Sequence, residues 1–144
     1  MTQEHDFKRF PELTNSQMRV FYLESPHFQI TRDFEAHVVK VTDGDTIRVT
    51  MEERDFSFPV RFLDIQAPEL DEEGGEESKS WLEDLVMGED VIIEIDPDNR
   101  VGKWGRLLGR IILSGLNINE LSLLSGMSVP FEESQNAFKT TAEA

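Results

Sequence analysis

From Phe34 onward, apolar residues recur with a period of two, and this pattern limits the fold more than any other feature of the sequence. Three successive segments, FEAHVVKV, TIRVTM and FSFPVRFLDI, alternate or run apolar and β-branched, with turn residues at Asp43-Gly44 and a polar break at residues 52–55. Such segments are typical of strands joined by turns. Two more segments of this kind, VIIEI and RLLGRIIL, come later, and DPDNRVGKWG between them indicates a hairpin or a longer turn. The sequence therefore predicts five strands.

Two helices are predicted around the last two strands. The segment SKSWLEDLVMG places its apolar residues on one face and is expected to end at Gly88. Asn117 and Glu120 resemble a capping box for a second helix, INELSLLSG, which Gly126 closes. Three strands, a helix, two strands and a helix are compatible with a five-stranded Greek-key barrel of the OB type, which binds oligonucleotides on one face. We therefore predict an α+β fold, mainly β, with this barrel over residues 34–114 and two to three helices.

The length of the chain suits one domain, which we place at residues 34–131 between an N-terminal extension, residues 1–33, and a polar tail, residues 132–144. Within the extension, LTNSQMRVFYLESP predicts a short helix capped at Thr14 or Asn15 and stopped at Pro26. A disordered extension is the alternative, but it would expose much apolar surface. We expect packing on the barrel, on a second subunit or on a protein partner, through Phe7, Phe10, Leu13, Met18, Phe21, Tyr22 and Leu23.

The formal net charge is -15, which lowers the expectation of tight, non-specific binding to nucleic acid. It does not exclude an enzyme that acts on phosphates, because the field inside a cleft can differ in sign from that of the whole protein. The chain has no cysteine, so disulfides and thiolate metal sites are excluded, and its three histidines lack metal-ligand spacing. The first residues show no signal peptide and no segment is long enough to cross a bilayer, so we expect a soluble, cytoplasmic protein.

Three short motifs carry the candidate chemistry. In DGDT, Asp45 follows a tight turn at the start of a strand, where a carboxylate can bind a hard cation such as calcium; a simple hairpin turn is the alternative. In VRFLDIQAPE, Arg61 could neutralise charge on a phosphate and Glu69 could deprotonate water, although such residues are more often a surface pair. In KWGR, a glycine precedes a second arginine, Arg106. Together these groups suit phosphodiester hydrolysis.

The segment from Phe34 to about Phe131 resembles the staphylococcal nuclease (thermonuclease) family, on the evidence of DGDT, VRFLDIQAPE, KWGRLLG and NINELSLLSGM in the family's order. The resemblance implies an OB-fold nuclease that uses calcium to hydrolyse DNA or RNA. It implies Asp45 and the position of Gln66 as metal ligands, Glu69 as general base, and Arg61 and Arg106 as catalytic arginines. Two further positions imply contacts to nucleotide phosphate and base: Lys103 and Trp104, whose indole offers a stacking face without the family's tyrosine hydroxyl.

The sequence departs from the family at several positions. Gln66 stands where the family usually has an aspartate, so the site loses one negative charge and should bind calcium more weakly. Asp64, two positions earlier on the same predicted strand face, is a candidate to compensate in part, although an exposed structural carboxylate is the default interpretation. The loop at residues 69–77 is acidic where the staphylococcal enzyme's loop is lysine-rich, which should weaken attraction of a polyanion.

Two hypotheses remain open from the sequence. The favoured one is a calcium-dependent nuclease with a weakened metal site. The alternative is a catalytically degenerate module for nucleic-acid binding or protein assembly, as in the nuclease-like repeats of Tudor-containing relatives. The family's long C-terminal helix is expected to be truncated or missing after Phe131.

Overall fold

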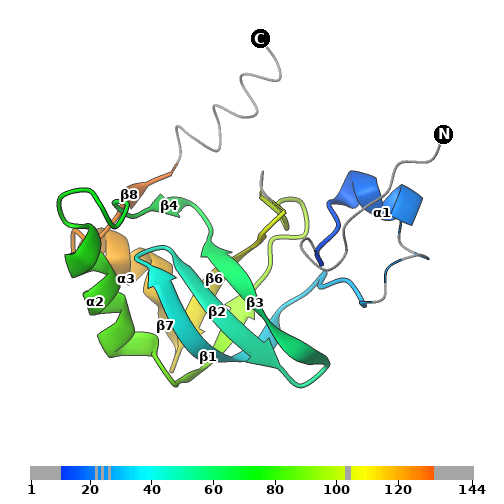
Figure 1. The fold of residues 1–144 in the computed structure, drawn as a ribbon, viewed down its shortest axis with the longest axis horizontal. Helices are drawn as coiled ribbons and strands as arrows, with labels where there is room; N and C mark the ends of the chain where they lie inside the picture. Colours follow the sequence, from blue (N-terminus) through cyan, green and yellow to red (C-terminus); the bar gives the residue numbers. More distant parts are fainter. Residues whose placement is uncertain (1–10, 22, 24, 26, 103–104, 132–144) are drawn as a thin grey trace, which may run out of the picture.

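The long strands close into a barrel in the computed structural model, which describes residues 11–21, 23, 25, 27–102 and 105–131 (Figure 1). The sheet order is β3-β2-β1-β5-β6-β7, and a further pairing between β3 and β6 closes it. Consecutive neighbours are antiparallel, whereas β3 and β6 run parallel. The five long strands are β1 (Phe34–Asp43), β2 (Thr46–Met51), β3 (Arg54–Phe62), β5 (Asp90–Glu94) and β6 (Leu107–Leu113). The predicted five-stranded barrel is therefore confirmed.

Three short strands extend this architecture. β7 (Leu116–Asn117) continues the barrel sheet from β6, and β4 (Ile65–Gln66) forms a separate two-stranded sheet with β8 (Val129–Pro130). In Figure 1 the β4–β8 pair lies at the end of the barrel where β1 turns into β2. The short sheet is therefore placed beside the DGDT turn.

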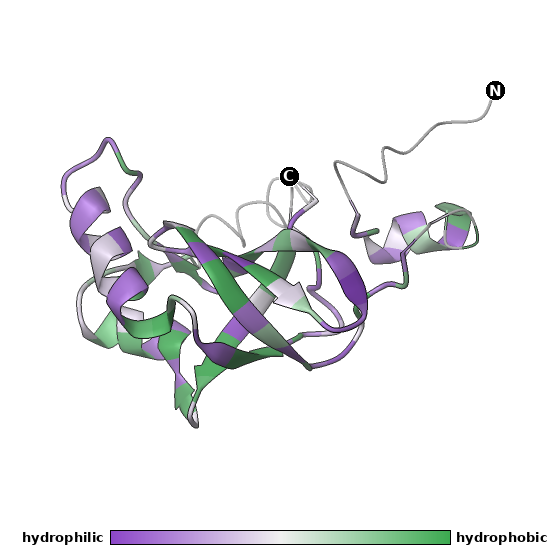
Figure 2. Cartoon of the chain, turned by 60° about the horizontal axis from the view of Figure 1, so that its bottom comes forward, coloured by the Kyte–Doolittle hydropathy of each residue, from purple (hydrophilic) through white to green (hydrophobic). Residues whose placement is uncertain are grey.

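Apolar and polar residues alternate along the strands, and this alternation creates the core because successive side chains point to opposite faces of the sheet. The apolar residues that point inward are buried, while many of the outward-facing ones are polar, as the mixed colouring of the strands in Figure 2 shows. The largest fully buried side chains of the barrel include Phe58, Phe62, Ile47, Ile93 and Ile111. Burial of such a side chain contributes roughly 1.5–3 kcal/mol.

Helices α2 (Gly75–Val86) and α3 (Ile118–Leu124) lie at one end of the barrel (Figure 1). α2 ends just before Gly88, which has a φ of 76°, a conformation that glycine adopts without a steric penalty. The side chain of Asn117 accepts a hydrogen bond from the backbone N–H of Glu120 at the start of α3. Both predicted helices are therefore confirmed, and α2 begins at Gly75, three residues before the SKSW segment.

The third strand is shorter than predicted. It was expected to continue to Ile65, but β3 ends at Phe62 and a turn at Leu63 and Asp64 follows. Asp64 has a φ of 68°, in the left-handed region that interrupts an extended strand. The buried amide of Asn119 stabilises the turn by donating 2.9 Å to the carbonyl of Leu63. The chain therefore changes direction before Gln66.

The extension contains helix α1 (Asn15–Phe21), which Thr14 caps. The Thr14 hydroxyl accepts from the backbone N–H of Gln17, and the Gln17 side chain accepts from the N–H of Thr14. This reciprocal pair is a capping box. The helix ends at Phe21, before the predicted stop at Pro26, which lies outside the described residues.

Several side chains of residues 11–33 are buried in the molecule. Leu13 and Ile30 have exposed fractions of 0% and 2%. Leu23 is 96% exposed, so it does not pack on the barrel, and its packing on a second subunit or a protein partner stays a prediction. Phe7, Phe10, Tyr22 and the tail after Phe131 lie outside the described residues. In the described part of the chain, no helix has both the length and the apolar character that crossing a bilayer requires.

Candidate active site

The pairing of β2 with β3 brings Asp45 next to Arg61. Thr46 faces Arg61 across the ladder, and the backbone N–H of Phe62 donates 2.8 Å to the carbonyl of Asp45. Gly44 allows this turn to lie against α2, since a Cβ at this position would overlap the side chains of Ser78 and Ala67. The glycine of DGDT is therefore required for packing as well as for the turn.

The parallel pairing of β3 with β6 brings Arg106 to the same region. Arg61 faces Leu108, Arg106 directly precedes β6, and the positive charge of Arg106 acts on the pKa of Arg61. Their neighbours Val60 and Leu107 point into the core with exposed fractions of 0%. Barrel closure therefore joins two arginines that are distant in the sequence.

The Asp45 carboxylate is nearly buried and already has several partners. Its Oδ2 accepts from the backbone N–H of Ala67 at 2.9 Å and lies 3.4 Å from Nη2 of Arg61, while its Oδ1 accepts from the Thr46 hydroxyl at 3.1 Å. An ionised carboxylate offers about four lone-pair sites. About one site therefore remains for a further ligand.

Asp43 is a site residue that the sequence reasoning missed. Its Oδ1 accepts from the backbone N–H of Asp45 at 3.0 Å. Burial raises the pKa of Asp43 to about 6, and Asp45 and Glu69 contribute because they add negative charge nearby. The first aspartate of DGDT was interpreted only as part of a turn, although two carboxylates on either side of one glycine are a signal for a shared charge site.

Arg61 is held by a hydrogen bond at the edge of its guanidinium and by an aromatic ring against its face. Nη1 donates 2.9 Å to the carbonyl of Phe62, and Cζ lies 4.2 Å from the centre of the Phe131 ring. Burial lowers the pKa of Arg61; Asp45 opposes this shift, and the positive charge of Arg106 adds to it. The charges of Asp43 and Glu69 also act on the Arg61 pKa. These electrostatic interactions show that the arginines and carboxylates share one region.

The loop between β4 and α2 positions Glu69. The backbone N–H of Glu69 donates 2.8 Å to the side chain of Glu72, and the N–H of Glu72 donates 2.9 Å back to the carbonyl of Glu69. Gly75 closes the loop, because a Cβ there would overlap the backbone of Glu69 and Leu70. Glu69 itself is exposed, so its carboxylate can meet solvent.

Gln66 and Asp64 are separated by the turn. Gln66 lies in β4 opposite Val129 and is exposed. Asp64 instead accepts 3.0 Å from Nη2 of Arg110, and its carbonyl accepts from the N–H of Phe131. The expectation that Asp64 shares a strand face with Gln66 and supports the metal site is therefore wrong. The default interpretation, an exposed structural carboxylate, describes it correctly.

The β5–β6 connection forms a hairpin that carries Arg106. The backbone N–H of Gly102 donates 2.8 Å to the carbonyl of Arg106, and the N–H of Leu108 donates 2.8 Å to the carbonyl of Arg100. Lys103 and Trp104, the predicted substrate contacts, lie outside the described residues.

The donor chemistry fits a hard cation, with few charged ligands. Asp43 and Asp45 offer carboxylate oxygens and Gln66 offers an amide oxygen, which calcium prefers, and burial together with the negative charges of Asp45 and Glu69 raises the pKa of Asp43. Among residues 11–131 that the structure describes, however, no three histidine, aspartate or glutamate side chains are grouped to hold a metal. The set therefore fits a weakly held cation.

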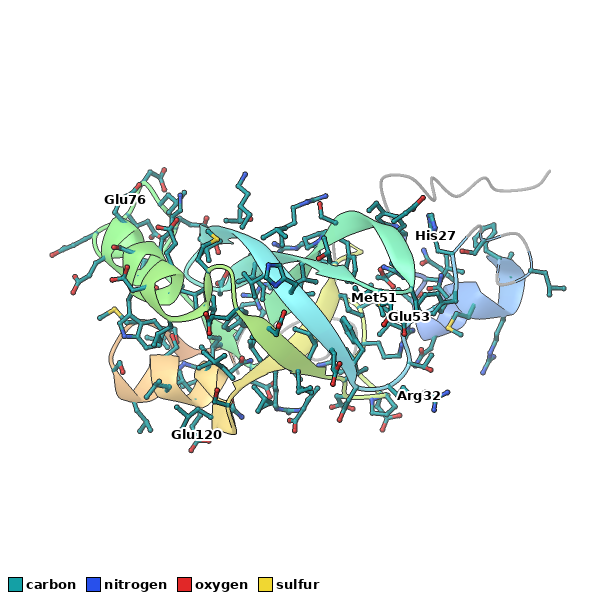
Figure 3. The ribbon with its side chains drawn as sticks, turned by 90° about the horizontal axis from the view of Figure 1, so that it is seen from below. His27, Arg32, Met51, Glu53, Glu76 and Glu120 are labelled. Atoms are coloured by element: carbon teal, nitrogen blue, oxygen red, sulfur yellow. The ribbon has the colours of Figure 1, made fainter. Side chains whose placement is uncertain are left out.

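A groove of about 1240 Å³ lies away from these residues. It is lined by the first residues of β1 and the last of β2, whereas DGDT joins the other ends of the same strands. In Figure 3, Met51 and Glu53 of this groove lie at the opposite end of the molecule from Glu76, in the first turn of α2. The groove and the candidate active site are therefore separate.

The chain is similar to several known proteins. A family model described as "Staphylococcal nuclease homologue" matches residues 59–144. An "Uncharacterized endonuclease" of Escherichia coli is 32% identical over 102 residues, which cover 70% of this chain and 63% of the relative.

Two further relatives carry nuclease names. A "Micrococcal nuclease" of Shigella flexneri is 31% identical over 106 residues, covering 67% of this chain and 58% of the relative. An SPbeta prophage-derived endonuclease of Bacillus subtilis (strain 168) is 30% identical over 95 residues, covering 62% and 31%. The chain thus spans less than two thirds of each of these relatives. Because the family model matches more than half of the chain, the protein belongs to the staphylococcal nuclease family.

Proposed function

We propose that the protein is a metal-dependent nuclease that hydrolyses phosphodiester bonds of nucleic acid. The observation that carries this proposal is the position of Arg61. Its guanidinium lies 3.4 Å from Asp45, and its pKa responds to the charges of Arg106 and Glu69. A binding surface has no need to collect two arginines, a general base and a buried aspartate at one place.

Each residue has a defined role in this proposal. Arg61 and Arg106 donate hydrogen bonds to the non-bridging phosphate oxygens, whose negative charge must be stabilised in the transition state. Glu69 is exposed and can accept a proton from the attacking water. Lys103 and Trp104 are proposed to contact the substrate's phosphate and base, which extends the site beyond the reacting group.

Calcium is the proposed cation, with Asp45 and Gln66 as ligands. When bound, it supplies Lewis-acid stabilisation of the phosphate and lowers the pKa of bound water. Support comes from the carboxylate and amide oxygens of these residues and from Asp43, whose charge can help to retain a cation without direct contact. Because Asp45 already accepts three hydrogen bonds, we expect the affinity for calcium to be low.

A second candidate function is a binding or assembly module without catalysis. The specific observations in its favour are the neutral Gln66 at a ligand position and the absence of a group of three acidic or histidine ligands in the described part of the chain. Under this alternative, Arg61 and Arg106 would bind phosphate without activating water.

Cleavage assays on single-stranded DNA and on RNA, with calcium and with EDTA, separate the two functions. We expect cleavage that requires calcium and that Glu69→Gln lowers by about 10²–10⁴-fold, because a neutral amide is a poor base. Gln66→Asp should tighten calcium binding and raise cleavage at limiting calcium, because affinity rises with ligand charge. A wild type that binds both nucleic acids and cleaves neither, with Gln66→Asp unchanged, would establish the binding module.

A further inference from the structure

Arg100 connects the N-terminal segment, residues 11–30, to the base of the hairpin that carries Arg106. The Arg100 side chain is 3% exposed. Its Nε donates 2.7 Å to the carbonyl of Ile30, and its Nη1 donates 3.0 Å to the carbonyl of Leu13 and 3.0 Å to Oδ1 of Asn15. One guanidinium therefore joins three points of the N-terminal segment.

The backbone continues this connection from Arg100 to Arg106. The carbonyl of Arg100 accepts from Leu108, Val101 pairs with Leu107, and the N–H of Gly102 donates to the carbonyl of Arg106. These backbone contacts restrict the position of Arg106 relative to Arg100. A displacement of the Arg100 guanidinium would therefore move or loosen the hairpin.

A second contact reaches the same loop, and the N-terminal segment is itself anchored. The Asn15 amide donates 3.1 Å to the carbonyl of Pro97. At its start the segment forms a buried ion pair between Glu12 and Arg54, the first residue of β3. β3 also carries Arg61, so the segment bridges the two elements from which the proposed catalytic arginines come.

We propose that Arg100 is a positioning residue for Arg106, and that the N-terminal segment is the support through which it acts. This inference rests on the proposed nuclease function for its effect on cleavage. The contacts themselves are independent of that function. A residue that only stabilised the barrel would affect all parts of it, whereas Arg100 acts on one hairpin.

Asn15→Ala is the most selective variant, because Asn15 is exposed and its side-chain hydrogen bonds to described residues go to Arg100 and Pro97 of this loop. Ser16→Ala, on the next exposed position of α1, is the matched control. We expect Asn15→Ala to speed hydrogen exchange at the amides of Gly102 and Leu108 about fivefold to tenfold, as for the loss of one or two hydrogen bonds, while core amides stay unchanged. Equal exchange in the two variants would overturn the inference.

A double-mutant cycle, with the cleavage rate as its readout, tests whether Arg100 acts through Arg106. Asn15→Ala should lower kcat in the wild-type background and leave kcat unchanged in an Arg106→Ala background, because no guanidinium remains to be positioned. The same fold-loss in both backgrounds would show a general loss of stability and overturn the inference. If the wild type cleaves neither DNA nor RNA with calcium, the proposed function fails, and the hydrogen-exchange result alone decides the role of Arg100.

Discussion

Two arginine–carboxylate pairs, one in each half of the barrel, differ in how completely they are enclosed. Arg54 and Glu12 form a two-bond pair whose side chains are 1% and 2% exposed. Arg61 and Asp45 are joined by one contact of 3.4 Å, and their side chains are 10% and 11% exposed. Arg54 also lies over the rings of Phe28, Phe56 and Phe58. The residue types are similar, but only the Arg54–Glu12 pair is fully enclosed by the protein.

Under the proposed function, the difference separates an ion pair that maintains the fold from one that is available for chemistry. In the Arg54 pair both carboxylate oxygens are bound by the guanidinium, and a third bond of 3.1 Å goes to the carbonyl of Phe28. Arg61 uses two of its five donors on partners among the described residues, so others can turn to a ligand. Enclosure, more than charge, distinguishes the two functions.

Breaking the enclosed pair should have the largest effect on stability. Arg54→Met leaves the Glu12 carboxylate buried without its partner, and we expect the free energy of unfolding to fall by about 3–5 kcal/mol. Denaturant titration measures this loss. The double variant Arg54→Met with Glu12→Leu should recover much of it, because no buried charge then remains. If the double variant is as unstable as the single one, the pair is not the source of the effect.

Breaking the open pair should affect cleavage far more than stability. Arg61→Met removes a donor for the phosphate, and we expect a rate loss of about 10²–10³-fold. Asp45 keeps the N–H of Ala67 and the Thr46 hydroxyl, so the free energy of unfolding should fall by about 1–3 kcal/mol, less than for Arg54→Met. Parallel cleavage and denaturant measurements test this. A stability loss as large as that of Arg54→Met would remove the distinction between the pairs.

The carboxylates of the open site should make the metal-free protein sensitive to pH. The pKa of Asp43 is raised from 3.8 to about 6, so its stabilising contribution is complete below pH 3.8 and is lost as the pH rises through about 6. In EDTA at neutral pH, Asp43→Asn should therefore raise the free energy of unfolding, by less than about 2 kcal/mol because the group is partly open to solvent. Denaturant titrations at several pH values measure it. If Asp43→Asn raised the free energy of unfolding equally at pH 3.5 and pH 7, the ionisation of Asp43 would not be the cause.

The acidic loop beside the open site should give the smallest effect, a change in salt dependence. Residues 69–77 carry six acidic side chains, and the whole chain has a net charge of -15. Salt screens repulsion as well as attraction. Raising the salt concentration from about 50 to about 200 mM should therefore leave the rate of cleavage of long DNA unchanged or increase that rate by a few-fold. Kinetics at constant free calcium measure this. A steep fall in rate would indicate an attractive field at the site and contradict the prediction.

The barrel was predictable because local patterns determine it. The period of two in β1, β2 and β3, the turn at Asp43-Gly44, and the glycines after α2 and α3 each depend on neighbouring residues only. The end of β3 was not predictable, because the turn at Asp64 depends on Asn119, which is far away in the sequence. Local patterns therefore predict where elements form and fail where a distant side chain ends them.

The candidate site shows the same limit. The resemblance to a family located Asp45, Arg61, Glu69 and Arg106, and their roles stay predictions until they are tested by substitution. Nothing in the residue types distinguishes Arg54 or Arg100 from a surface arginine. Their buried partners, Glu12 and Leu13, lie 42 and 87 positions away, and such contacts leave no periodic signal.

The parallel pairing of β3 with β6 also has a consequence for folding kinetics. It joins Val60 to Leu107 and thus closes a long loop, whereas the β1–β2 and β2–β3 hairpins close short ones. Because loop closure is entropically more costly for longer loops, we expect the hairpins to form early and the β3–β6 ladder late. Arg61 and Arg106 meet only across that ladder. In a refolding experiment, enzymatic activity should therefore return in the last phase, after most of the circular dichroism signal of the sheet.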